Sequence, residues 1–198
     1  MVEMHLLTVN ENFSYDPFYA FGVVSAFSRF MQGYKPEADR DSIFDALCRS
    51  METDPNRFKQ DAANVEKLAH SFPAQDIITK LSNPQTLGDF PDLQAALVHI
   101  AGNPRFKYSR LFAIGLFTTL DLADPELAKD ETNYPEALKQ ISEGLNLPLE
   151  KLRKDLDLYR SNLEKMQQAQ QAIEDMLAAD RKQRERRSEE QSSDNLLE

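Results

Sequence analysis

From Leu149 to Glu198 the chain contains no glycine or proline. In the first part of this stretch, apolar residues are spaced alternately three and four apart, which is the seam of a heptad repeat with one polar position. The seam consists of Leu149, Leu152, Leu156, Tyr159, Leu163, Met166, Gln170, Ile173 and Leu177. The pattern predicts one long helix of roughly 35 to 40 residues, or about 50 to 60 Å.

Such a helix is longer than a domain built from the preceding residues. We expect its first half to pack on that domain and its second half to project. The seam needs a partner, which is another copy, a different protein or an earlier helix of this chain. For Gln167–Ala179 we expect an outside partner or a solvated helix end. The basic run Arg181–Arg187 follows. It either compensates the dipole of a solvated helix end or contacts a membrane surface or an acidic partner. The candidate interaction residues are Gln167, Gln170, Ile173, Leu177, Arg181, Lys182, Arg184, Arg186 and Arg187.

The remainder of the chain also has the pattern of helices. Asp16-Pro17 and Asp54-Pro55 each combine an N-cap residue with a proline at the first helical position. Strand-like alternation bounded by Asn-Gly turns is not evident. We therefore expect an all-α fold, a compact multi-helix bundle with the long C-terminal helix. The other expected helices follow Pro17 and Pro55 or span about Ala38–Met51, Ala74–Leu81, Asp92–Ala101, Lys107–Leu122 and Tyr134–Gly144, with Gly144 ending the last one.

Three regions are expected along the chain. Residues 1–147 form a helical body, and residues 148–187 form the long helix, which packs on the body and then projects. Residues 188–198 are polar and acidic, and we expect them to form a disordered tail.

A short pattern occurs twice in the body, 93 residues apart. Phe13-x-Tyr15-x-x-Phe18-Tyr19-Ala20-x-Gly22 is matched by Phe106-x-Tyr108-x-x-Leu111-Phe112-Ala113-x-Gly115. Glycine within a helix costs roughly 1 kcal/mol relative to alanine, so close approach of two helices is the natural compensation. Ala20, Gly22, Ala113 and Gly115 are therefore candidate helix-packing residues, unless the match is a coincidence between two apolar helices.

The sequence contains no recognisable catalytic, cofactor-binding or metal-binding motif. The net charge of -10 disfavours nucleic acid as a partner, because phosphate backbones repel an acidic chain. The histidines lie far apart, and the single cysteine, Cys48, has no neighbouring base and is expected to be buried and inert. No apolar stretch reaches the roughly 20 residues of a membrane span. We expect a non-enzymatic protein without cofactors or metals that acts by binding other proteins.

Five segments of the chain have a recognisable combination of residues: Tyr15–Gly22, Arg29–Pro36, Ile43–Cys48, Tyr108–Leu116 and Asp155–Met166. Together they resemble the thylakoid formation protein family, the photosystem II biogenesis proteins of about 29 kDa. The resemblance extends from about Val2 to Leu177. Family members usually begin with a further helical stretch ahead of the segment that matches Val2–Leu7. We therefore expect the family's N-terminal helix start to be absent from this chain.

The resemblance implies an accessory protein of photosystem II biogenesis and repair. The implied partners are FtsH-type membrane proteases, with photosystem II subunits as further candidates and a peripheral membrane contact. The implied location is the cytoplasmic side of cyanobacterial thylakoids, or the stromal side in a plastid. The alternative is a structural coiled-coil protein that self-associates or forms a scaffold on the thylakoid surface, and we expect a monomer or a weak dimer.

Overall fold

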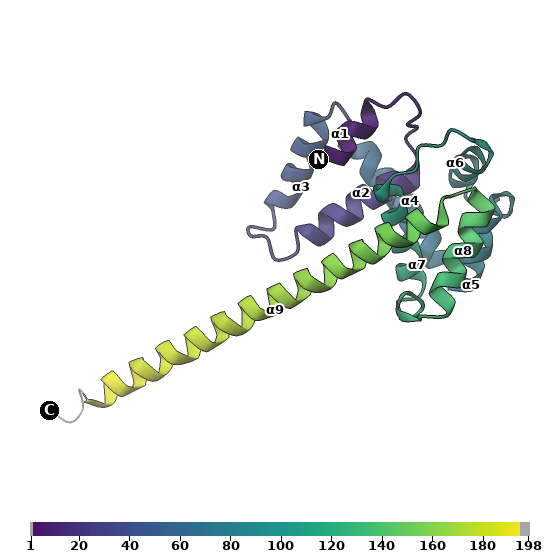
Figure 1. Ribbon diagram of the computed structural model, residues 1–198. Helices are drawn as coiled ribbons and strands as arrows, with labels where there is room; N and C mark the ends of the chain where they lie inside the picture. Colours follow the sequence, from purple (N-terminus) through teal and green to yellow (C-terminus); the bar gives the residue numbers. More distant parts are fainter. Residues whose placement is uncertain (1, 195–198) are drawn as a thin grey trace. The chain divides into compact units, whose positions relative to one another are not determined.

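The computed structural model describes the backbone of residues 2–194 and the side chains of residues 2–183 (Figure 1). Within these residues the structure consists of helices and contains no strand, so the predicted all-α fold is confirmed. The α-helices are α1 Val2–Thr8, α2 Pro17–Phe30, α3 Asp39–Ser50, α4 Pro55–Ser71, α5 Ala74–Ser82, α6 Pro91–Gly102, α7 Arg110–Ala123, α8 Asn133–Leu145 and α9 Leu149–Asp194, with short 3-10 helices at Pro84–Thr86 and Leu127–Lys129.

The chain divides into two units, Met1–Tyr159 and Arg160–Glu198, with the boundary inside α9. The first turns of α9 belong to the first unit, where Leu152 and Leu156 are fully buried. Helical backbone continues to Asp194, past Arg187, because no glycine or proline interrupts it. Residues 188–194, which we expected to be part of a disordered tail, are therefore helical, and residues 195–198 lie outside the described part of the chain.

Side-chain caps fix where the central helices begin. The Asp16 carboxylate accepts a hydrogen bond from the backbone N–H of Tyr19, and the Ser109 hydroxyl accepts one from that of Phe112. The end of α8 differs from our expectation, because Gly144 lies inside the helix and Asn146 takes the left-handed position with φ 54°. A Cβ at Gly144 would overlap the backbone of Ser82, so this glycine permits close packing of α8 on α5.

The centre of the body is the crossing of α2 and α7, where Gly22 and Gly115 face each other. A Cβ on Gly22 would overlap the carbonyl group of Leu111 and lie 2.9 Å from the backbone nitrogen of Gly115. A Cβ on Gly115 would likewise overlap the carbonyl group of Phe18. The neighbouring Ala20 and Ala113 are both fully buried, so the structure brings together the helices that carry all four candidate packing residues.

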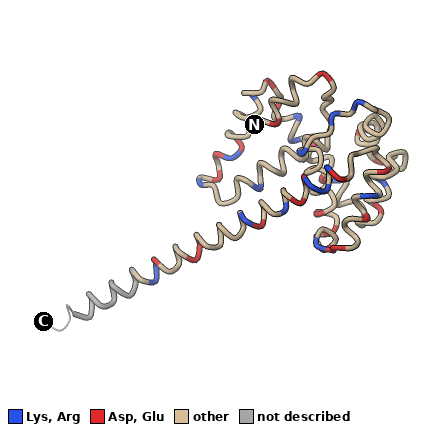
Figure 2. Tube along the Cα trace, viewed as in Figure 1, with Lys and Arg blue, Asp and Glu red and all other residues tan. Residues whose placement is uncertain are grey.

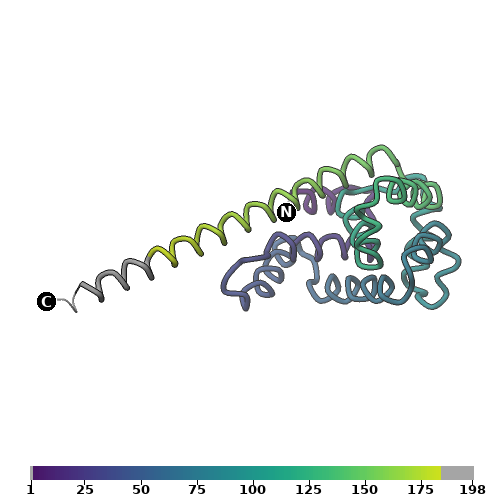
Figure 3. Tube along the Cα trace, turned by 90° about the horizontal axis from the view of Figure 1, so that it is seen from below, coloured from purple at the N-terminus to yellow at the C-terminus, as the bar shows by residue number. Residues whose placement is uncertain are grey.

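The repeated pattern extends well beyond these glycines. In sequence order and spacing, helices α1 to α4 correspond to α6 to α9, with α5 between the two copies. The course of the chain through these helices can be followed by colour in Figure 3. Both copies have a non-glycine residue at positive φ after the third helix, Glu52 in the first and Asn146 in the second. Buried apolar residues also correspond, at Met4 and Leu97, Leu7 and Ile100, Phe44 and Leu138, and Phe58 and Leu152. The body is thus built from two copies of one four-helix unit that meet at the glycine crossing.

Replacing Gly22 with alanine should strongly destabilise the protein, because the new Cβ would force two backbones apart. We expect a loss of at least about 3 kcal/mol in the free energy of unfolding, measured by urea denaturation. Gly102 is the matched control, because it lies in α6 and a Cβ there would meet nothing within 4 Å. Gly102→Ala should leave stability unchanged or raise it by up to about 1 kcal/mol. Equal stability of the two variants would contradict the close crossing.

Candidate interaction surfaces

Each copy of the repeat holds a tyrosine against a carboxylate and a cation. The Tyr15 hydroxyl donates to Oδ2 of Asp61 at 2.6 Å, and the Arg57 guanidinium lies 4.0 Å from the centre of the Tyr15 ring. Burial raises the pKa of Tyr15 far above its ordinary value, and the hydrogen bond to Asp61 raises it further. This tyrosine therefore stays protonated and donates a hydrogen bond that fixes the segment before α2 to α4.

The second copy repeats this arrangement with Tyr108. Its hydroxyl donates to Oδ2 of Asp155 at 3.0 Å, and Nζ of Lys151 lies 5.0 Å from the ring centre. Burial, followed by the charge of Asp155, raises the pKa of Tyr108 far above its ordinary value. Both clusters are structural ties between helices, because their tyrosines cannot ionise near neutral pH and therefore cannot act as bases.

An ion pair joins the distal ends of α2 and α7. Nη2 of Arg29 lies 2.9 Å from Oδ2 of Asp121, and Nη1 donates to the hydroxyl of Tyr159 at 3.0 Å. The same guanidinium lies 5.6 Å from the centre of the Phe117 ring. Arg29 thereby fixes the beginning of α9 within the first unit, since Tyr159 is the last residue of that unit.

Chemistry-bearing groups do not converge in the described residues. Cys48 is buried, and burial raises the pKa of its thiol, so it stays protonated and unreactive near neutral pH. His5, His70 and His99 are exposed and lie on different helices. Among residues with described side chains, no three His, Cys, Asp or Glu residues are grouped so that they could hold a metal ion. In the same residues no helix is long and apolar enough to cross a membrane.

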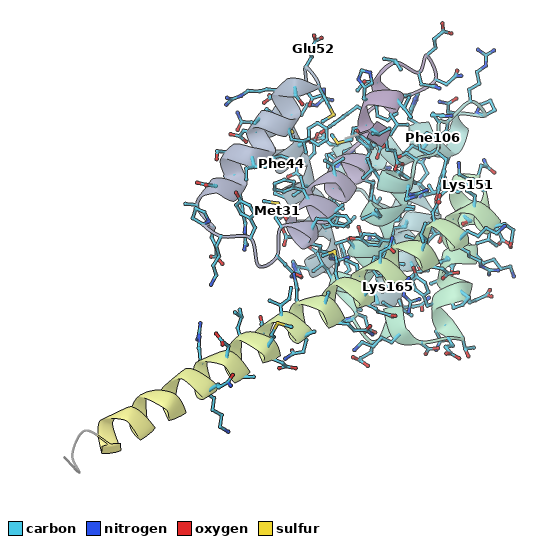
Figure 4. All side chains as sticks on the ribbon, turned by 60° about the vertical axis from the view of Figure 1, so that its left-hand side comes forward. Met31, Phe44, Glu52, Phe106, Lys151 and Lys165 are labelled. Carbon is cyan, nitrogen blue, oxygen red and sulfur yellow. The ribbon has the colours of Figure 1, made fainter. Side chains whose placement is uncertain are left out.

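Grooves are present on the first unit, and three of them are lined entirely by described residues. One, of about 410 Å³, lies between α2, α3 and α4 and includes Met31 and Phe44 in its lining (Figure 4). A second, also of about 410 Å³, is lined by residues of α1, α2 and α4 and of the segments that precede α2 and α4, among them Tyr15. The third, of about 500 Å³, lies beside α5 and α8 and includes four carboxylates among its lining residues. Sequence reasoning missed all three, because it considered each helix separately.

In the second unit, α9 presents apolar residues to solvent. Ile173, Met176 and Leu177 are 58%, 73% and 54% exposed. Of the polar interaction residues predicted from sequence, Gln167, Arg181 and Lys182 are exposed and Gln170 is half-buried. Figure 2 shows both acidic and basic residues along this helix. The side chains of Arg184, Arg186 and Arg187 lie outside the described residues.

Comparison with known proteins gives consistent results. A family model described as thylakoid formation protein matches residues 1–188. The chain is 56% identical to Protein Thf1 of Trichormus variabilis over 193 residues, which is 98% of this chain and 83% of the relative. It is 55% identical to Protein Thf1 of Nostoc punctiforme, with 98% and 82% covered. A solved structure described as Psb29 matches with a TM-score of 0.73 and 40% identity, over 92% of this chain and 84% of that chain.

The buried N-cap residue Asp16 should make stability depend on pH. Burial raises the pKa of its carboxyl to about 7, against the opposing effect of hydrogen bonds from the backbone of Tyr19 and Phe18. Because the folded state then holds a proton that the unfolded state releases near pH 4, stability should fall as pH rises from about 4 to 7 and become level above that. The slope contributed by this group is at most about 1.4 kcal/mol per pH unit.

Asp16→Asn keeps the capping oxygen but cannot ionise, so its unfolding free energy should lack this part of the slope. Urea denaturation of both proteins at pH 5, 6, 7 and 8 measures the difference. Parallel curves for the variant and the parent chain would show that Asp16 does not titrate in this range.

Proposed function

The chain belongs to the thylakoid formation protein family, and from this premise we propose that it is a non-enzymatic adaptor in photosystem II biogenesis and repair. In this proposal it binds an FtsH-type thylakoid protease and supports the turnover of damaged reaction-centre subunits. Photosystem II subunits are further proposed partners. The work is done by helical surfaces that recognise other proteins, without bond chemistry or a cofactor.

The observation that carries this proposal is the exposed apolar side of α9. Ile173 and Leu177 occupy successive seam positions and are both more than half exposed. Large apolar side chains grouped on a surface are typical of sites that bind other proteins. A helix with such residues at heptad spacing presents a rigid strip to a partner, since its backbone hydrogen bonds are made within the helix itself.

The proposed location is the cytoplasmic side of the thylakoid membrane in a cyanobacterium, or the stromal side in a plastid. The contact with the membrane would be peripheral. Arg181 and Lys182 are exposed near the end of the described side chains, and cationic residues of this kind are attracted to anionic lipid headgroups. The same two residues would also suit an acidic partner surface.

Recovery of the protease from detergent-solubilised thylakoids tests the proposed function. The tagged chain should retain an FtsH-type protease, detected with a specific antibody. A variant with Ile173→Gln and Leu177→Gln should recover at least tenfold less, because it removes apolar contact while keeping good helix formers. Failure of the unaltered chain to recover any protease would contradict the proposed partner.

A matched control moves one glutamine on the outer side of the same helix. Gln168→Ala combined with Ala172→Gln preserves composition and charge and leaves the seam untouched. This control should recover as much protease as the parent chain.

The same seam is also consistent with the alternative function, self-association through a coiled coil. Light scattering during size-exclusion chromatography separates the two, because a scaffold of this kind would be dimeric at micromolar concentration. The alternative would be favoured if the parent chain is a dimer and recovers no protease, and if the paired glutamine substitutions convert this dimer to a monomer.

A further inference from the structure

The turn after the third helix is tied down in the second copy of the repeat but not in the first. In the second copy, Nδ2 of Asn146 donates to the carbonyl oxygen of Ala101, near the end of α6, at 2.8 Å. The first copy has Glu52 and Thr8 at these positions, and a carboxylate has no hydrogen to donate. Both residues are exposed and lie at the rim of the groove that Tyr15 also lines.

The backbone of Glu52 is strained. Its φ of 57° is in the left-handed region, which asparagine tolerates and glutamate rarely adopts. Within the described residues, the Glu52 carboxylate makes no hydrogen bond or ion pair that would offset this strain. Strained residues of this kind are found mainly at binding and catalytic sites. Figure 4 shows Glu52 beyond the end of α3, at the edge of the first unit.

The floor of this groove is aromatic. Tyr19 and Phe58 are both 2% exposed, and Phe13 and Tyr15 are half-buried beside them. The ring centres of Phe13 and Tyr19 are 5.0 Å apart, and those of Tyr15 and Phe58 are 5.3 Å apart. Aromatic rings attract cations and also pack well against the apolar stem of a long basic side chain.

The rim of the groove has more negative than positive charge. Its carboxylates belong to Glu52 and Asp54, and its one cation is Arg57. Nε of Arg57 lies 3.8 Å from Oδ2 of Asp61, so this positive charge already has a partner. Oδ1 of Asp54 accepts from the backbone N–H of Asn56 at 2.9 Å, and its other oxygen accepts no hydrogen bond from the part of the chain that the structure describes. The rim therefore offers unused acceptors to a cationic donor.

We propose that this groove binds an arginine side chain of another protein. The guanidinium donates to the carboxylates of Glu52 and Asp54, and the stem lies on the aromatic floor. Arginine suits the site better than lysine, because its planar group can donate to two carboxylates at once. The volume of about 410 Å³ is sufficient for one such side chain.

The second copy indicates that the acidic rim is not required by the fold. It has the uncharged residues Asn146–Pro148 where the first copy has Glu52–Asp54. The inference goes beyond the proposed function, which assigns protease binding to α9 and does not require this groove. Neither experiment below uses the protease, so the two proposals fail independently.

The first experiment titrates the full ¹⁵N-labelled chain with acetyl-Gly-Arg-Gly-amide, followed by NMR. The backbone signals of Glu52, Thr53 and Arg57 should shift and saturate. The same peptide with citrulline in place of arginine keeps the shape without the charge, and it should bind at least about tenfold more weakly. Equal binding of the two peptides, or no shift of these signals, would overturn the proposal.

Free arginine separates a protein partner from a small-molecule ligand. Its α-carboxylate has no peptide bond to neutralise it and would be repelled by the acidic rim, so it should bind more weakly than the peptide. Tighter binding of free arginine would overturn a protein as the occupant.

The second experiment uses Glu52→Asn, which gives the first copy the residue of the second. The variant should melt at or above the temperature of the parent chain, because asparagine tolerates the left-handed backbone and can donate to the Thr8 carbonyl. It should bind the arginine peptide at least about tenfold more weakly.

Glu143→Gln is the matched control, because Glu143 is exposed on α8 and its loss changes the net charge equally. This control should bind the peptide as the parent chain does. A folded Glu52→Asn variant with unchanged binding, or an equal loss in Glu143→Gln, would overturn the groove as the site.

Discussion

The close crossing of α2 and α7 is the constraint from which the rest of the body follows. Two helices can approach until their backbones touch only where neither carries a side chain, and Gly22 and Gly115 provide that place. Because each glycine faces the carbonyl of the other helix, at Leu111 and Phe18, the crossing is fixed in both position and register. The other helices of each copy then pack around this pair, and their apolar faces form the core.

The two copies share a framework and differ in what fills it. N-caps, tyrosine ties and helix ends recur at equivalent positions, as in Asp16 and Ser109 or Glu52 and Asn146. The second copy packs the rings of Phe117 and Tyr134 together, whereas the first packs those of Phe27 and Phe44, which line a groove that also includes Arg40. A rigid body can recognise another molecule only through surface that its own core leaves uncovered.

Much of this could be predicted from the sequence. Asp-Pro pairs mark the starts of α2 and α4, and the repeated Ala-x-Gly pattern points to the central crossing. The prediction that Gly144 ends its helix is wrong. A glycine near a helix end can either stop the helix or allow another backbone to pack closely, and here the backbone of Ser82 lies against it. The groove was not predicted, since it depends on the distance between helices.

The reciprocal contact at the centre has the symmetry of an isologous dimer interface, in which residue i meets j and j meets i. Here both sides of that interface lie in one polypeptide, so the pairing needs no second molecule and does not weaken on dilution. It also means that each half occurs once, and a substitution on one outer face is not copied onto the other. A fused pair can therefore specialise its two faces separately, which two identical subunits cannot do.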